Sequence, residues 1–349
     1  MPPACGAIHG ARGLAVRSLY SHAVAACLPA RHVPLFCPAS VSAAADPCHP
    51  DPAALEAGLR RVQRQITPAW LHLEVARRMA ERLALIRHPP ALVLDWRAAA
   101  GGSRALLAAR YPAARVDAVE ASAGLAARSK AQLRGPWWHR LRGVPAQVWP
   151  EDAAPAHTAG MLWANMALHQ TSDPALMIAR WHAALAVDGF LMFSTFGPDT
   201  LRELRALYER LGWGVPGPEF VDMHDIGDAL VQAGFADPVM DMERLTLSWP
   251  DAEALLAELR TLGGNAARER FAGLRTPRWR AGLARALRDS LTGDDGRLRL
   301  SFEIVYGHAF KPPPRLRVAP TTTVGVEQLR QLARRPRATA APNKPESRD

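Results

Sequence analysis

Short apolar runs alternate with amphipathic segments through the middle of this chain. Ala91–Leu94 is an apolar run that ends at Asp95, and Arg115–Val119 is a second one that ends at Glu120. The residues between the two runs place their apolar side chains on one helical face. The pattern therefore predicts a buried strand, a helix and a second buried strand over residues 91–120.

The same alternation continues to about residue 211. Three further strands are predicted at about 143–149, 160–164 and 190–196, and helices at about 122–133, 174–186 and 200–211. Alternating strands and helices are typical of a mainly parallel sheet whose ligands bind at the carboxyl ends of the strands. We therefore expect an α/β fold with a Rossmann-like sheet, and we expect Asp95, Glu120, Asn165 and Phe196 to lie along that edge.

Additional helices and strands flank this region. Asp51–Ile86 has apolar residues at helical spacing and predicts two helices before the first strand. Beyond residue 225 the chain predicts a helix, a strand at 240–249, two helices and a strongly alternating strand at 297–310. We interpret the last strand as an antiparallel seventh strand at the sheet edge, and residues 251–291 as a helical insert that forms a lid.

A glycine turn joins the first predicted strand to its helix. Gly101 and Gly102 lie where a tight turn would enter the helix, and Ser103 follows as an N-cap residue. Such a turn presents free backbone N–H groups to a ligand, and an acid at the end of the next strand, here Glu120, can hold two ribose hydroxyls. The pattern is that of the nucleotide-binding half of a doubly wound sheet.

The terminal segments differ from the centre in composition. Residues 1–50 are rich in Ala, Pro, Cys and His, contain no acid before Asp46, and are interrupted by basic residues too often for a secretory signal. We expect a disordered extension there, or a start codon placed too far upstream. Residues 312–349 are rich in Pro, Arg and Thr, and we expect a basic disordered tail. The folded domain is therefore expected to span residues 51–311.

Charge and cysteine usage narrow the class of protein. The formal net charge is +10, but residues 1–50 carry +2 and residues 312–349 carry +5, which leaves +3 for the centre. No basic stripe with interleaved aromatic residues is present, so we expect no nucleic-acid partner. No run approaches the ~18 apolar residues of a membrane span.

The four cysteines lie within the first 48 residues and form no Cys-x-x-Cys pair. We expect a reducing, cytoplasmic setting, a monomer, and no metal site.

Four motifs, mostly in the second half of the chain, resemble one enzyme family. They are Trp163–His169 (WANMALH), Phe193–Leu204 (FSTFGPDTLREL), Phe220–Gly227 (FVDMHDIG) and Tyr306–Phe310 (YGHAF). In these motifs the chain resembles the malonyl-acyl-carrier-protein O-methyltransferases of biotin synthesis, over about residues 60–311. The resemblance implies a class I methyltransferase fold. It also implies methyl transfer from S-adenosylmethionine to the free carboxylate of malonyl carried on acyl carrier protein.

The resemblance further implies a cofactor site, in which this chain departs from the family. The family usually carries Asp-x-Gly-x-Gly-x-Gly after the first strand, whereas this chain has Arg97, Ala99 and Gly101 at the three glycine positions. The segment Val144–Trp149 also lacks the acid that such enzymes place on the adenine. The cofactor-binding residues implied are Asp95, Arg97, Ala99, Gly101, Gly102, Glu120 and Asn165.

Arg97 is the largest departure, because a side chain at the first glycine position would point toward the methionine end of the cofactor. Two outcomes are open. The arginine swings away to solvent with its stem over Trp96, or it fills the site and leaves the protein catalytically silent.

The implied reaction needs no general base, because a carboxylate oxygen is already nucleophilic, and we assign no catalytic residue. The resemblance implies that Arg, His or Tyr groups orient the malonyl carboxylate, and the candidates are His169, Arg202 and Tyr306. Each residue also has a purely structural interpretation. His169 would be a core histidine, Arg202 a solvated helix residue, and Tyr306 a packed strand residue.

Three functions remain open from the sequence. The first is a carboxyl O-methyltransferase of biotin synthesis. The second is another methyltransferase of the same fold, or a related factor that acts on a protein of a respiratory complex. The third is a degenerate, non-catalytic protein that keeps the fold and binds a partner such as acyl carrier protein. The fold alone does not decide among them.

Overall fold

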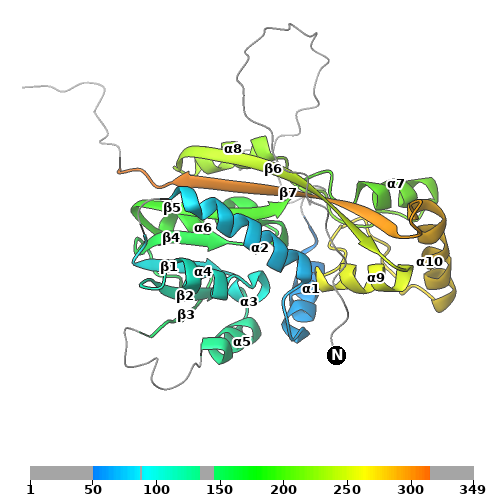
Figure 1. Ribbon diagram of the computed structural model, residues 1–349, viewed down its shortest axis with the longest axis horizontal. Helices are drawn as coiled ribbons and strands as arrows, with labels where there is room; N and C mark the ends of the chain where they lie inside the picture. Colours follow the sequence, from blue (N-terminus) through cyan, green and yellow to red (C-terminus); the bar gives the residue numbers. More distant parts are fainter. Residues whose placement is uncertain (1–49, 87–88, 134–144, 315–349) are drawn as a thin grey trace, which may run out of the picture. The chain divides into compact units, whose positions relative to one another are not determined.

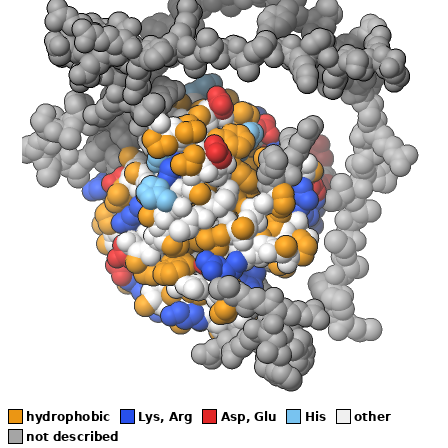
Figure 2. Space-filling view, turned by 90° about the vertical axis from the view of Figure 1, so that its left-hand side faces the viewer, with side chains coloured by type: hydrophobic (Ala, Val, Ile, Leu, Met, Phe, Trp, Pro, Cys, Tyr) orange, Lys and Arg blue, Asp and Glu red, His pale blue; other side chains and the backbone are white. Residues whose placement is uncertain are grey.

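The computed structural model describes residues 50–86, 89–133 and 145–314. The predicted extension at the start of the chain and nearly all of the predicted basic tail lie outside the described residues. The face drawn in Figure 2 carries basic and acidic side chains interspersed among apolar ones. None of the described helices is long and apolar enough to cross a membrane.

A seven-stranded sheet forms the centre of the described region (Figure 1), with the strand order β3-β2-β1-β4-β5-β7-β6. Its strands are β1 (Leu92–Trp96), β2 (Arg115–Glu120), β3 (Val148–Pro150), β4 (Ala159–Ala164), β5 (Leu185–Phe196), β6 (Ala236–Trp249) and β7 (Leu298–Phe310). Strands β1 to β5 pair in parallel, whereas β7 runs antiparallel to β5 and β6. This arrangement confirms the predicted fold class. The strand order reverses between β1 and β4, which is where such sheets bind ligands.

Helices occupy the connections between the strands. They are α1 (Pro52–Arg64), α2 (Trp70–Arg82), α3 (Ala98–Gly101), α4 (Arg104–Arg110), α5 (Ala123–Leu133), α6 (Pro174–Ala184), α7 (Arg202–Arg210), α8 (Met223–Gln232), α9 (Ala252–Thr261) and α10 (Pro277–Leu291), with 3₁₀ turns η1 (Leu83–Leu85) and η3 (Leu168–Gln170). The two helices predicted before the first strand are α1 and α2. The helical insert predicted between the late strands contains α9 and α10.

The position predicted for the last strand is wrong. Strand β7 lies between β5 and β6, and β6 forms the edge of the sheet. Nearly every residue of β7 is buried, as expected for a strand that is covered on both faces. Residues of β6 are instead mostly half-buried or exposed in alternation, which suits an edge strand.

The sheet carries one apolar cluster on each face. Met79 of α2 and Trp163 of β4 belong to the first cluster, and Trp181 of α6 belongs to the second. Val93 and Leu94 are neighbours in β1 but lie in different clusters. This follows from the two-residue period of a strand, and it explains why the predicted strands read as continuous apolar runs.

The insert between β6 and β7 lies at the far ends of these two long strands, together with α7 (Figure 1). Its helices begin at recognisable caps. Asp251 accepts a hydrogen bond from the N–H of Ala254 at 2.7 Å, and Thr276 accepts one from Trp279 at 3.2 Å. The buried residues Leu255 and Leu287 fix the two helices on the first apolar cluster.

Candidate functional site

Two buried carboxyl groups lie at the carboxyl ends of β1 and β2. Asp95 and Glu120 are each 1% exposed. Glu120 Oε1 accepts hydrogen bonds from the N–H of Ala99 at 2.8 Å and from the hydroxyl of Ser129 at 2.5 Å, whereas Oε2 has no partner among the described residues. Burial raises the pKa of Glu120 to about 7, and the hydrogen bonds from Ser129 and Ala99 only partly oppose this effect.

Asp95 has no hydrogen-bond partner on either carboxyl oxygen in the described part of the chain. Burial, and then the charge of Glu120, raise the pKa of Asp95 well above its ordinary value. Buried polar atoms are normally hydrogen-bonded, so each exception requires an explanation. Three unpartnered carboxyl oxygens at one sheet edge fit a ligand that brings O–H or N–H donors.

Arg97 adopts the backbone conformation that a glycine position requires. Its φ of 59° and ψ of 41° lie in the left-handed region, which favours glycine. The residue is only 4% exposed. Nε donates to Glu151 Oε1 at 2.7 Å, and Nη1 donates to the carbonyl of Gln170 at 2.9 Å. The prediction that the Arg97 side chain turns out to solvent is therefore wrong. Its guanidinium instead connects the end of β3 to the turn after β4.

Glu151 is a residue that the sequence analysis missed. It directly follows β3, and it also accepts a hydrogen bond from Trp96 Nε1 at 3.1 Å. The strand predicted at about 143–149 ends one residue before the observed end of β3 at Pro150, and Glu151 lies just beyond it. Glu151 supplies the counter-charge that the buried Arg97 requires, and no local pattern in the sequence links the two residues.

Asn165 fastens the glycine turn to α2 and β5. Its Nδ2 donates to the carbonyls of His72 and Gly101, both at 2.8 Å, and its Oδ1 accepts from the hydroxyl of Ser194 at 2.8 Å. Both amide N–H donors are therefore used within the protein. Asn165 lies at the edge as expected, but its side chain holds the fold together there.

The start of α2 covers the glycine turn. Gly102 has a φ of 69°, and a Cβ at this position would lie 2.4 Å from Leu73 Cδ2 and 3.1 Å from Pro68 Cγ. Gly102 is thus required for two reasons: its positive φ, and the close approach of Leu73 and Pro68. Ser103 occupies the N-cap position as predicted, but its hydroxyl accepts from Trp163 Nε1 at 2.6 Å and forms no capping bond.

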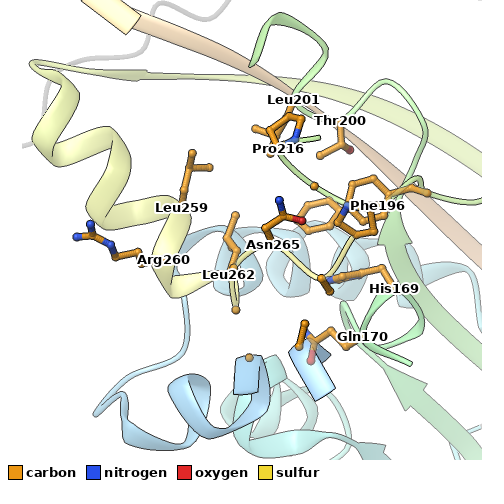
Figure 3. Close-up of a pocket in the computed structure, with 18 of the residues that line it drawn as sticks. His169, Gln170, Phe196, Thr200, Leu201, Pro216, Leu259, Arg260, Leu262 and Asn265 are labelled. Carbon is orange, nitrogen blue, oxygen red and sulfur yellow. The ribbon is translucent and has the colours of Figure 1, made fainter. Parts of the chain in front are cut away.

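A pocket of about 230 Å³ lies beside this edge (Figure 3). It is lined by α1, the turn η3, the end of β5, α7, α9, β7 and the loops that precede α7, join α7 to α8 and follow α9. Most of the lining side chains are apolar, including Leu55, Leu59, Leu204, Leu256, Leu259 and Phe302. The polar side chains among them include His169, Gln170, Thr200, Arg205 and Arg260. The pocket can therefore exclude water from a ligand and still bind charged or polar groups.

His169 is the one predicted substrate residue that lines the pocket. Its ring packs on Phe196 with 4.4 Å between centroids, and Nδ1 lies 3.4 Å from Thr195 Oγ1. Nε2 has no partner in the described structure. Burial, together with the charges of His72 and Arg97, holds the pKa of His169 well below its ordinary value, so the imidazole is neutral.

Arg202 and Tyr306 do not line the pocket. Arg202 is exposed at the start of α7 and pairs with Glu203 at 3.2 Å, which corresponds to the solvated alternative. Tyr306 is buried in β7, where its hydroxyl donates to Glu243 at 3.3 Å and the guanidinium of Arg82 lies 3.9 Å from its ring centroid. These partners hold both side chains away from this pocket.

Comparison with known proteins identifies the family. No family model matches the chain. It is 41% identical over 258 residues to the malonyl-acyl-carrier-protein O-methyltransferase of Gallionella capsiferriformans, covering 71% of this chain and 86% of that protein. It is also 41% identical over 256 residues to the protein of the same name from Laribacter hongkongensis, covering 71% and 85%.

Among solved structures, the YcgJ protein of a Bacillus superposes with a TM-score of 0.47 at 12% identity, covering 69% of this chain and 99% of that one. This likeness is too loose to carry an argument, whereas the two sequence matches extend over most of each relative. The chain therefore belongs to the malonyl-acyl-carrier-protein O-methyltransferase family.

Proposed function

We propose that this chain transfers a methyl group from S-adenosylmethionine to the free carboxylate of malonyl carried on acyl carrier protein, in biotin synthesis, and that the responsible domain spans residues 51–311. The observation that carries the proposal is the position of the turn η3. Its Gln170 carbonyl accepts from Arg97 at the cofactor edge, while His169 and Gln170 line the pocket. An acceptor in the pocket thus reaches the edge at which the cofactor is expected.

The carboxyl groups at the edge fit S-adenosylmethionine. Glu120 Oε2 is free to accept from a ribose hydroxyl, and the two oxygens of Asp95 are free to accept from the ammonium of the methionine part. When bound, the cofactor supplies a methyl group activated on a sulfonium. Because both carboxyl groups are almost inaccessible, binding requires displacement of the side chains that cover them.

The pocket suits a carboxylate acceptor. The reaction requires a carboxylate oxygen in line with the methyl group at about 3–3.5 Å, with water excluded. Apolar side chains from α1, α7 and α9 exclude water. The neutral imidazole of His169 adds no charge near the reacting atoms. Alignment and water exclusion are therefore the tasks of this chain's residues.

The test is methyl transfer from labelled S-adenosylmethionine to malonyl-acyl carrier protein, with acetyl-acyl carrier protein as the control that lacks the carboxylate. We expect label on the first and none on the second. Calorimetric titration with S-adenosylhomocysteine measures cofactor binding separately. Cofactor binding without transfer to the malonyl carrier would contradict the proposed acceptor and favour another methyl acceptor, such as a respiratory-complex protein.

A second candidate function is a partner-binding protein that has lost its cofactor. The observation in its favour is the low exposure of Asp95, Arg97 and Glu120, at 1%, 4% and 1%. This candidate predicts no heat of binding with S-adenosylhomocysteine and retained binding of acyl carrier protein. Measurable cofactor binding would exclude it.

A further inference from the structure

Arg205 is a partly buried cation in the wall of the apolar pocket. Its three guanidinium nitrogens donate to the backbone carbonyls of Thr200 at 3.3 Å, Gly217 at 3.4 Å and Pro218 at 2.6 Å. Among the described residues, no carboxylate forms an ion pair with it. Arg97, the other buried arginine considered above, pairs with Glu151. Burial lowers the pKa of Arg205, and the charge of nearby Glu219 only partly opposes this effect, without an ion pair between the two. Arg205 therefore lacks the directly paired carboxylate that a buried arginine usually has.

The hydrogen-bonding capacity of Arg205 is not exhausted by these contacts. A guanidinium has five N–H donors, one on Nε and two on each terminal nitrogen. One N–H on each nitrogen is used by a carbonyl, which leaves one N–H on each of Nη1 and Nη2. A guanidinium with one unused N–H on each terminal nitrogen can donate to both oxygens of a carboxylate.

A chain of aromatic rings links Arg205 to the turn that borders the cofactor edge. The guanidinium lies 5.7 Å from the ring centroid of Phe220, and Phe220 meets His169 edge to face with 6.0 Å between centroids. Arg260 also lines the pocket, but Figure 3 shows its side chain directed away from the other labelled residues. Arg205 is thus the cation on the side of the pocket nearest His169.

We infer that Arg205 binds the acceptor carboxylate inside the pocket and selects substrates that end in a free carboxylate. This inference rests on the proposed function. In an apolar pocket an arginine–carboxylate pair is stronger than in water. As the methyl group is transferred, a C–O bond forms and an S–C bond breaks. The carboxylate and sulfonium charges cancel, and no proton is exchanged. The neutral methyl ester no longer pairs with Arg205, which favours its release.

The test compares two probes, malonyl-pantetheine and its methyl ester, in calorimetric titrations of the full chain without cofactor. We expect the wild type to bind the acid at least roughly tenfold more tightly than the ester, as one charge-assisted pair allows. Arg205→Met should remove this preference, and Arg205→Lys should keep part of it. Arg202→Met is the matched control, because Arg202 belongs to the same helix but is exposed and paired with Glu203.

A second measurement does not depend on the folding of a variant. The Nε–H signal of Arg205 in ¹⁵N-labelled wild type, assigned from its absence in Arg205→Lys, should shift with the acid and not with the ester. In turnover assays, Arg205→Met should raise KM for malonyl-acyl carrier protein at least tenfold and leave the Kd for S-adenosylhomocysteine within twofold.

The outcomes separate this inference from the proposed function. An unshifted Arg205 signal, an unchanged preference in Arg205→Met, or an equal loss in Arg202→Met overturns the inference. If the wild type transfers no methyl group but prefers the acid through Arg205, the proposed function fails and the binding role of Arg205 stands.

Discussion

The Arg97–Glu151 pair should contribute several kcal/mol to folding, although it replaces a glycine of the family motif. The two side chains are 5% and 13% exposed, and their charged atoms are 2.7 Å apart. Removing one partner of a buried ion pair costs about 3–5 kcal/mol, because the remaining charge is left unpaired. We expect Glu151→Gln to cost about 3 kcal/mol, the low end of that range, because Arg97 keeps its bond to the Gln170 carbonyl.

Arg97→Gly should cost less. It leaves Glu151 with Trp96 and, at 4.0 Å, the more exposed Arg180 as its partners. It also removes a left-handed non-glycine residue, which returns about 1–2 kcal/mol. The double variant leaves no unpaired charge. Its cost should therefore fall short of the sum of the single costs by about 2 kcal/mol, within the range of coupling energies for residues in contact.

Urea unfolding of the four proteins, followed by circular dichroism at pH 7.5, measures this coupling. The control cycle uses the exposed pair Glu56 and Arg60, for which a coupling of about 0.2–1 kcal/mol is expected. A coupling at Arg97–Glu151 no larger than in the control would refute the argument that the two residues form a buried, mutually dependent pair.

Three further predictions concern the cofactor edge. Glu120→Ala should weaken S-adenosylhomocysteine binding at least roughly tenfold by calorimetry, because a carboxylate bond to a ribose hydroxyl contributes ~1.5–3 kcal/mol; unchanged affinity would remove Glu120 from the site. Because the pKa of Glu120 rises from 4.5 to about 7 on folding, its contribution to stability is full below pH 4.5 and is lost as pH rises to about 7. Urea unfolding between pH 4 and 8 should show this loss, roughly 3 kcal/mol, in the wild type and not in Glu120→Gln. Arg97→Gly combined with Ala99→Gly should change cofactor affinity by less than about fivefold, roughly 1 kcal/mol; a large gain would mean that the natural protein has lost its cofactor.

The features predictable from the sequence were those set by local periodicity. Apolar runs located the strands, and the polar residue after each run located the edge at which Asp95, Glu120 and Asn165 lie. Strand order is not a local property. The alternation in residues 297–310 predicted the seventh strand. Its position between β5 and β6 instead depends on which elements pack on each face of that strand.

The parts of the site that were missed depend on contacts between distant segments. Glu151 lies 54 residues from Arg97 in the chain, and no local pattern links them. Arg205, which was not among the residues expected to bind substrate, could have been found from helical spacing. Arg205 is four residues after Leu201 and next to Leu204, on the apolar stripe of α7, whereas Arg202 lies beside that stripe.

The Arg97–Glu151 pair also changes how the altered glycine motif bears on catalysis. A lone guanidinium 4 Å from a sulfonium would cost roughly 4 kcal/mol at an effective dielectric constant of 20. The Glu151 carboxylate, 2.7 Å away, offsets most of the charge of Arg97. Repulsion of the sulfonium is therefore no obstacle to cofactor binding, and only the volume of the arginine side chain can interfere. That volume lies between the end of β3 and η3, whereas the unpartnered carboxyl oxygens lie at the ends of β1 and β2. The arginine therefore occupies the part of the edge where the adenine is expected, instead of the methionine end that the glycine motif indicated. It engages neither Glu120 Oε2 nor the oxygens of Asp95, which stay without a partner in the described structure.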